Sequence, residues 1–170
     1  EGAEWFHFTG ITPALSKNAA EICLDACKKA KKKGLTVSCD LNYRKKLWTR
    51  EEARNTMTNL MKYVDICISN EEDAKDVFNI CSENSDAEKG KLNREGYKNV
   101  AKQLKEKFGF LYIAITLRES ISANDNYWSG LLYDGKEYYF SKKYLMHIVD
   151  RVGGGDSFGG GLIYGLMKGY

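Results

Sequence analysis

Short apolar runs and longer amphipathic stretches alternate along this 170-residue chain, and the two patterns predict strands and helices in turn. Runs of apolar and aromatic residues predict strands over 5–9, 35–39, 65–69 and 110–116. Between these runs the apolar positions recur every three to four residues, which is typical of helices that bury one face. Helices are expected from Ser16 to about Lys33, from Thr49, from Asn70, and over 94–107.

The second half of the chain adds three further signals. The run at 110–116 is apolar at almost every position, as in parallel strands that are buried on both faces. Asp134 and Gly135 separate the runs 127–133 and 136–141, and this dipeptide predicts a hairpin turn. The last segment, from about Gly155 to Lys168, predicts an apolar helix. The polar stretch 82–92 is expected to be a loop.

Strand alternates with helix four times before the hairpin. This order predicts a single α/β domain over 1–170, with a mostly parallel sheet between two layers of helices. Ligands of such sheets bind beyond the carboxyl ends of the strands. A site is therefore expected where the residues after each predicted strand meet, namely 10–12, 40–44, 70–73, 116–118 and 150–156.

The composition and the charge exclude several classes of function. Lys and Arg total 26 against 23 acidic residues, and no basic block is longer than the lysine-rich 28–33, so a nucleic-acid-binding arm is not expected. No apolar run is long enough for a membrane span, and no signal peptide is visible. The five cysteines lack paired C-x-x-C spacing, so a reducing, cytoplasmic location is expected. Cys23 and Cys27 are interpreted as core filler rather than metal ligands.

The stretch from Asp150 to Phe158 is the most informative. Gly153, Gly154 and Gly155 come directly before the last predicted helix, where backbone N–H groups can close on an anion. Asp156 would repel a phosphate, but it suits a base that faces an attacking hydroxyl. The alternative is a tight turn in which Asp156 only caps the helix, and the spacing leaves both interpretations open. The P-loop and G-x-G-x-x-G motifs of other nucleotide-binding proteins are absent.

The same stretch resembles the C-terminal signature of the ribokinase-like, or phosphofructokinase-B, carbohydrate kinases, in which an aspartate, two variable residues and Gly-Ala-Gly-Asp open a helix. Gly154 stands here where the usual residue is alanine. The resemblance implies a three-layer αβα fold. It also implies that Gly153, Gly154 and Gly155 form the anion hole for the transferred phosphate, and that Asp156 is the catalytic base.

Two further motifs of this family follow in the family's order. Residues 40–44 match its Asp-x-Asn-x-Arg motif, and 70–73 resemble its Asn-x-x-Glu motif, with Asp73 one carbon shorter than the usual glutamate. The resemblance implies a magnesium and phosphate network at Asn70 and Asp73, with no metal ligand assigned directly. It places the ATP site at Asn42, Tyr43, Arg44, Thr116, Leu117, Arg118, Glu119, Ser120 and Ile121.

Within the family, the chain is most similar to the kinases of 2-keto-3-deoxygluconate. Residues 7–15, 47–48, 116–118 and 150–152 carry this likeness. It implies ATP-dependent phosphorylation of the 6-hydroxyl of that sugar acid, with Arg44 and Asp156 in contact with the substrate. The implied cofactors are ATP and Mg²⁺, and the resemblance also allows a monovalent cation near Asp150 and a homo-oligomer. A small-molecule sugar acid is the expected partner, with no nucleic acid and no membrane.

Members of this family are about twice as long, so a partial chain is expected, without the N-terminal lid and sugar-binding part and without the C-terminal end. Two alternatives stay open: a related fructokinase or ribokinase, and a catalytically silent nucleotide-binding module. His7 and His147 are interpreted as filling space in strands rather than binding metal. Trp5, Trp48 and Trp128 are interpreted as core anchors.

Overall fold

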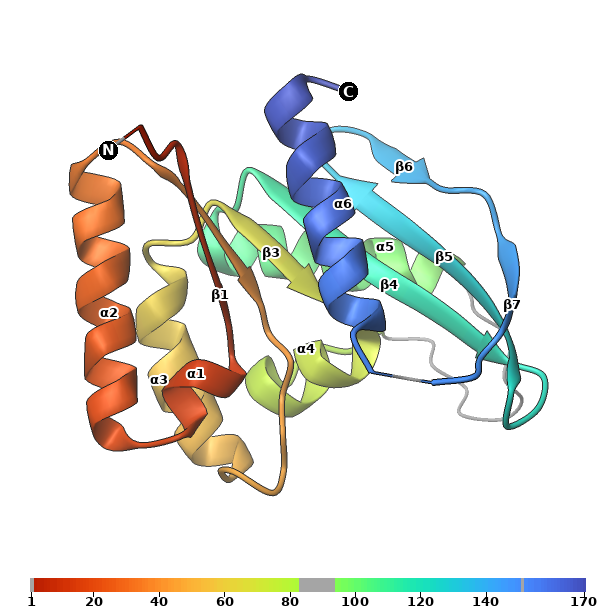
Figure 1. Ribbon diagram of the computed structural model, residues 1–170, viewed down its shortest axis with the longest axis horizontal. Helices are drawn as coiled ribbons and strands as arrows, with labels where there is room; N and C mark the ends of the chain where they lie inside the picture. Colours follow the sequence, from red (N-terminus) through yellow and green to blue (C-terminus); the bar gives the residue numbers. More distant parts are fainter. Residues whose placement is uncertain (1, 83–93, 151) are drawn as a thin grey trace.

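The structure is a computed structural model that describes residues 2–82, 94–150 and 152–170 (Figure 1). The predicted loop at 82–92, except for Ser82, and Arg151 therefore lie outside the described residues. The strands are β1 Trp5–Thr9, β2 Thr36–Asp40, β3 Ile66–Ser69, β4 Tyr112–Ser120, β5 Asp125–Tyr133, β6 Tyr138–Phe140 and β7 Tyr144–His147. The helices are α1 Ile11–Ala14, α2 Lys17–Lys32, α3 Arg50–Met61, α4 Glu71–Phe78, α5 Arg94–Phe108 and α6 Gly154–Lys168.

These strands form one sheet in the order β1-β2-β3-β4-β5-β6. Strand β7 pairs with the first half of β5, whereas β6 pairs with its last residues. Strands β1 to β4 are parallel, whereas β5 runs antiparallel to β4, β6 and β7. The predicted α/β class is confirmed. The carboxyl ends of β1 to β4 meet at one edge of the sheet, as the sequence pattern required for a shared site.

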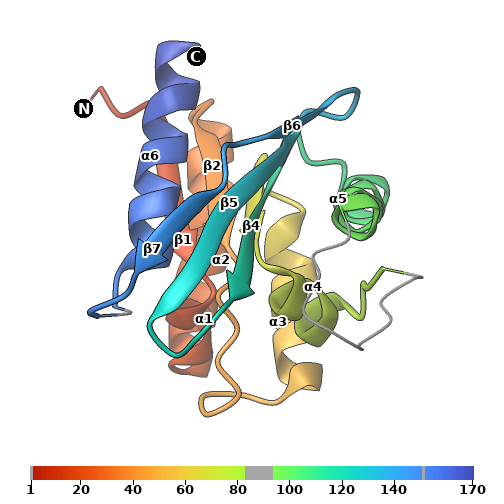
Figure 2. The same ribbon diagram turned by 90° about the vertical axis from the view of Figure 1, so that its right-hand side faces the viewer.

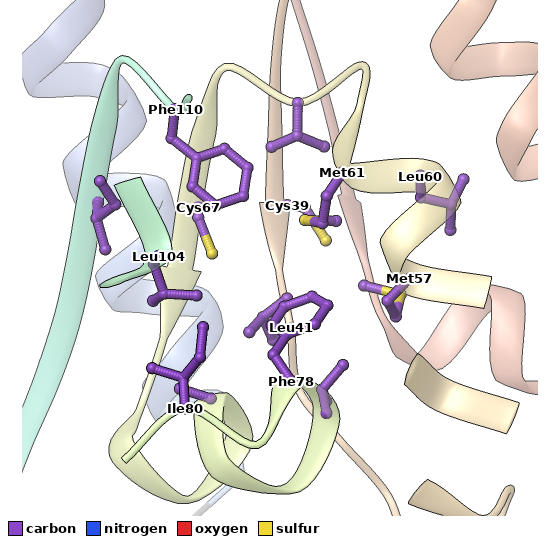
Figure 3. Packing of buried hydrophobic residues seen from close by; sticks show 14 of the residues in the cluster. Cys39, Leu41, Met57, Leu60, Met61, Cys67, Phe78, Ile80, Leu104 and Phe110 are labelled. Carbon is purple, nitrogen blue, oxygen red and sulfur yellow. The ribbon is translucent and has the colours of Figure 1, made fainter. Parts of the chain in front are cut away.

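The helices cover the two faces unequally. Each parallel connection from β1 to β4 moves one place along the sheet, so right-handed crossovers put α2, α3, α4 and α5 on the same face. The hydrophobic core lies under these helices, and Figure 3 shows Cys39, Cys67, Phe78, Leu104 and Phe110 within it. Helix α6 lies on the opposite face, which completes the predicted three layers (Figure 2).

Local capping explains where three of the helices begin. The Ser16 hydroxyl accepts a hydrogen bond from Ala19 N at 3.1 Å. Thr49 and Glu52 form the reciprocal capping box that the sequence predicts. The Asn70 side chain accepts from Asp73 N at 2.7 Å, so α4 begins directly after β3.

The largest difference from the predicted elements is the length of β4. The strand was expected to end at Thr116, but β4 continues to Ser120, and eight residue pairs join it to β5. Residues 117–120 are therefore strand, although 116–118 were expected to form a loop. The short helix α1 and the exposed strand β7 are two further elements that the hydrophobic pattern does not predict.

Four of the five cysteines pack inside the protein. Cys23, Cys27, Cys39 and Cys67 are buried free thiols, whereas Cys81 is exposed. Burial raises the pKa of the Cys27 thiol to about 12, so this group behaves as an apolar filler. The interpretation of Cys23 and Cys27 as core residues is confirmed. No helix in the described part of the chain is long and apolar enough to cross a membrane.

Candidate active site

A cavity of about 550 Å³ opens at the carboxyl ends of the parallel strands, beside the start of α6. It is bounded by the end residues of β1 to β3, one residue in the middle of β4, the first residue of α1, the loop after β2, the start of α4, one residue of β5 and the glycine-rich segment before and within α6. The lining residues are Thr9, Ile11, Asp40, Asn42, Arg44, Ile68, Ser69, Asn70, Asp73, Thr116, Trp128, Val152, Gly153, Gly154, Gly155 and Asp156. Motifs more than 100 residues apart in sequence thus share one cavity.

The glycine-rich segment forms the first turn of α6. Gly153 is the N-cap and has φ = 81°, a left-handed conformation that strains residues with a Cβ. The Ser157 amide closes the turn by donating to Gly153 O at 2.9 Å. A 15-residue helix therefore starts at this cavity, where its free N–H groups favour an anion. Asp156 lies in that first turn and is exposed to the cavity.

The loop after β2 faces this helix start. Asn42 has φ = 38°, a left-handed conformation that is uncommon for a residue other than glycine. Its side-chain Nδ2 donates to Thr9 Oγ1 at 3.1 Å, which ties the loop to the end of β1. Arg44 is exposed, and the one hydrogen bond shown for its guanidinium goes to the Tyr43 carbonyl at 3.2 Å. Its positive charge is thus available to a ligand.

Asn70 and Asp73 bind each other across the first turn of α4. Asn70 Nδ2 donates to Asp73 Oδ2 at 2.9 Å, and Asn70 Oδ1 accepts the capping hydrogen bond from Asp73 N. The other carboxylate oxygen of Asp73 accepts from Tyr43 N at 3.1 Å. The two sequence motifs at 40–44 and 70–73 are therefore joined by a direct hydrogen bond.

Two carboxyl groups in the cavity have unusual proton affinity. Burial, with the nearby Asp156 charge, raises the pKa of Asp40 to about 6. Burial, followed by the charge of Asp40, raises the pKa of Asp73 to about 7. The Arg44 charge and backbone N–H donors oppose both shifts. Both groups therefore change charge near neutral pH, as groups in ligand sites often do.

The structure separates the predicted ATP-site residues of β4, because neighbours along a strand point to opposite faces. Thr116 lines the main cavity and, with Arg118, a second one of about 270 Å³. Leu117 and Glu119 instead line a cavity of about 300 Å³ under α5. Ser120 bonds Asn126, and Ile121 is 57% exposed in the following turn. Of these six residues, only Thr116 lines the same cavity as the glycine-rich segment.

Asp40 and Trp128 line the cavity. Asp40 lies in the segment 40–44 where a site was expected but had no role assigned, and Trp128 was not predicted as a site residue. Asp40 carries a sequence signal, since it opens the matched motif at 40–44. Trp128 carries none, because its position depends on the pairing of β5 with β4, which places it opposite Arg118. The interpretation of the three tryptophans as core anchors is confirmed for Trp48, which is buried in the hydrophobic core. It is wrong for Trp128, which is half-buried in the cavity wall, and for Trp5, which is half-buried outside the core.

The two histidines lie in strands, as predicted, but with different surroundings. The Nδ1 atom of His7 is 2.7 Å from Ser38 Oγ, and Trp5 also donates to that hydroxyl. His147 is not packed into the strand layer, because its side chain is 66% exposed and lies 2.8 Å from Asp125 Oδ1. In the residues that the structure describes, no three His, Cys, Asp or Glu side chains converge closely enough to hold a metal ion.

Comparison with known proteins agrees with this arrangement. The family model described as pfkB family carbohydrate kinase matches residues 1–170. The chain belongs to the pfkB family of carbohydrate kinases. The predicted three-layer α/β fold of this carbohydrate-kinase family is therefore confirmed.

Three similar proteins are named as kinases of different substrates. The crystal structure of 2-dehydro-3-deoxygluconokinase from Thermotoga maritima has 52% identity and a TM-score of 0.91, covering 99% of this chain and 49% of that one. A 2-dehydro-3-deoxygalactonokinase from Haloferax volcanii is 30% identical over 99% of this chain and 46% of its own length. An ATP-dependent 6-phosphofructokinase from Thermoanaerobacterium thermosaccharolyticum is 28% identical over 100% of this chain and 46% of its own length. The chain spans about half the length of these relatives.

Proposed function

We propose that the protein transfers the γ-phosphoryl group of ATP to the 6-hydroxyl of 2-keto-3-deoxygluconate, the sugar acid also called 2-dehydro-3-deoxygluconate. One observation carries this proposal: Asp156 and the three glycines of the α6 start face the loop 40–44 across a single cavity. A hydroxyl and a triphosphate that share this cavity would meet beside a carboxylate and a row of backbone N–H groups.

The chemistry follows from these groups. Asp156 would accept the proton of the substrate hydroxyl while its oxygen forms a bond to the γ-phosphorus. The bond from that phosphorus to the oxygen bridging the β-phosphate breaks, and ADP leaves with the electron pair. The backbone N–H groups at Gly153, Gly154 and Gly155 would hold the negative charge on the transferred group, aided by the helix start.

Mg²⁺ fits the donor set at the cavity only in part. The half-buried Asp40 carboxylate has the oxygen chemistry that Mg²⁺ prefers, and a Cβ at position 155 would lie 3.8 Å from its Oδ2. Because the described residues offer no group of three ligands, phosphate and water oxygens would supply the remaining positions. When bound there, Mg²⁺ would neutralise phosphate charge. A magnesium role for Asn70 and Asp73 stays a prediction.

Substrate choice rests on charge and on similarity. Arg44 is the only Lys or Arg among the cavity-lining residues that the structure describes, and a guanidinium binds a carboxylate with two parallel hydrogen bonds. The 52% identical protein is named for this sugar acid and the 30% identical one for its galactose-type counterpart. The phosphofructokinase relative favours a second candidate, in which the acceptor is fructose 6-phosphate and Arg44 meets its phosphate.

The test is ADP release by the intact protein with Mg-ATP, offered 2-keto-3-deoxygluconate, its galactose-type epimer, fructose 6-phosphate, fructose and ribose. The proposal expects the highest kcat/KM with 2-keto-3-deoxygluconate. A preference for fructose 6-phosphate would select the second candidate. ATP binding without turnover on any sugar, by a folded protein, would favour the catalytically silent module.

A further inference from the structure

The Asp73 carboxylate is committed to two hydrogen bonds inside the protein. Its Oδ2 accepts from Asn70 Nδ2 at 2.9 Å, and its Oδ1 accepts from Tyr43 N at 3.1 Å. The residue is only 7% exposed, so little of it reaches a ligand in the cavity. One bond anchors the carboxylate to its own helix, and the other reaches into the loop after β2.

That loop has other attachments as well. Arg44 O accepts from Leu47 N at 2.9 Å, which closes a turn within the loop. The Tyr43 side chain packs against the hydrophobic core, and its hydroxyl donates to Trp48 O at 3.2 Å. Leu41 N donates to Ile68 O at 2.9 Å, which continues the strand pairing, and Asn42 Nδ2 donates to Thr9 Oγ1 at 3.1 Å. Two residues before Arg44, Asn42 has a left-handed backbone conformation. This conformation is uncommon and persists only when neighbouring contacts fix it. The bond from Tyr43 N to Asp73 is the backbone hydrogen bond nearest to Arg44 that joins this loop to a helix.

We propose that Asp73 is a positioning residue, whose carboxylate fixes the loop that carries Arg44 by holding the Tyr43 amide. Asp73 then acts on the substrate through Arg44, without touching the substrate or organising a metal ion. The inference rests on the proposed function, in which Arg44 binds the acidic substrate. It assigns to Asp73 a task that depends on the present position of its carboxylate, and we expect a side chain one carbon longer to shift that position.

The substitution Asp73→Glu separates this task from magnesium organisation. Glutamate is the usual residue at this place in the matched motif, so a magnesium role predicts that the variant keeps its activity. The positioning role predicts a KM for 2-keto-3-deoxygluconate raised about tenfold, since loss of one good hydrogen bond has that order of effect. It also predicts kcat within about twofold of the wild type and an unchanged Mg²⁺ dependence.

A double-mutant cycle tests whether the effect passes through Arg44. In an Arg44→Ala background, Asp73→Glu should change the KM for the sugar acid by less than about twofold, because the positioned group is gone. Asp76→Asn is the matched control, since Asp76 is an α4 carboxylate that pairs with Arg50 outside the cavity. Independent, additive effects of Asp73→Glu and Arg44→Ala would overturn the proposal, and so would a raised Mg²⁺ requirement at unchanged KM.

Amide hydrogen exchange tests the same contact without relying on turnover. In Asp73→Ala the Tyr43 amide should exchange at least about tenfold faster, whereas the Leu41 amide, bonded to Ile68 O, serves as an internal reference. Equal acceleration of both amides, or no acceleration of Tyr43, would overturn the positioning role. If the wild type shows no kinase activity but Tyr43 responds as expected, the proposed function fails and the contact stands.

Discussion

Gly130 on β5 lies directly under the ring of Phe158 on α6. A Cβ at position 130 would lie 3.0 Å from Cε2 and 3.3 Å from Cζ of that ring, closer than side chains normally approach. Gly159 lies beside it, where a Cβ would be 3.6 Å from Ile68 Cδ1. These contacts place the first turns of α6 on the sheet, and Asp156 belongs to the first turn.

Replacing Gly130 with alanine should therefore disturb the site more than the fold. We expect Gly130→Ala to displace Phe158, to cost about 1–2 kcal/mol in unfolding free energy, and to lower kcat about tenfold by moving Asp156. Urea denaturation and ADP release measure the two effects. Gly160→Ala is the control, because a Cβ there meets no atom within 4 Å. Equal, wild-type kcat values in both variants would contradict the role of this contact.

Gly10 offers a test of the turn that follows β1. A Cβ at this position would lie 2.0 Å from Leu41 O, which is backbone and cannot move aside alone, and Gly10 N donates to Asp40 O at 2.8 Å. Gly10→Ala should lower the unfolding free energy by about 3 kcal/mol or more, because β1 and the loop after β2 must separate. A urea midpoint equal to that of the wild type would contradict this close approach.

Stability should fall as pH rises from about 4 to 7. The pKa of Asp73 is raised from 3.8 to about 7, so in this range the folded protein binds a proton that the unfolded chain has lost. The contribution of Asp73 to the unfolding free energy is fully present below pH 4 and is lost as the pH rises through 7. Between pH 5 and 7.5 the loss is about 2–3 kcal/mol. The pKa of Asp40 is raised to about 6, so this group also lowers the unfolding free energy as the pH rises.

The variant Asp73→Asn isolates this effect. Its unfolding free energy, measured with urea at pH 5 and 7.5, should depend on pH less than that of the wild type by about 2 kcal/mol. Asp76→Asn is the matched control, because it removes a carboxyl group from the same helix outside the cavity. The same pH dependence in Asp73→Asn and in the wild type would mean that Asp73 is ionised throughout this range.

Local chemistry explains which parts of the fold were predictable. Ser16, Thr49 and Asn70 cap helices with their own side chains, so the helix starts depend on a few neighbouring residues. The alternation of strands and helices then places the loops at 40–44 and 70–73 at one edge of the sheet. Helix α1 has four residues and β7 is wholly exposed, so neither has a hydrophobic period to detect.

The cavity was predictable only where a motif marked it. Gly153 and Asp156 stand in a recognisable sequence, whereas the cavity position of Trp128 depends on the register that pairs it with Arg118. Leu117 lies on the opposite face from Thr116, because neighbouring residues of a strand alternate between the two faces. The bond from Tyr43 N to Asp73 also needs coordinates, because it joins a backbone group to a side chain 30 residues away.

The most direct test of the central claim is kcat of Asp156→Asn compared with its affinity for ATP. Asparagine keeps the size of the side chain but cannot take the hydroxyl proton. The account predicts that kcat for 2-keto-3-deoxygluconate falls by about 100-fold or more while the Kd for ATP changes less than about threefold. A kcat close to that of the wild type would contradict the assignment of Asp156 as the base.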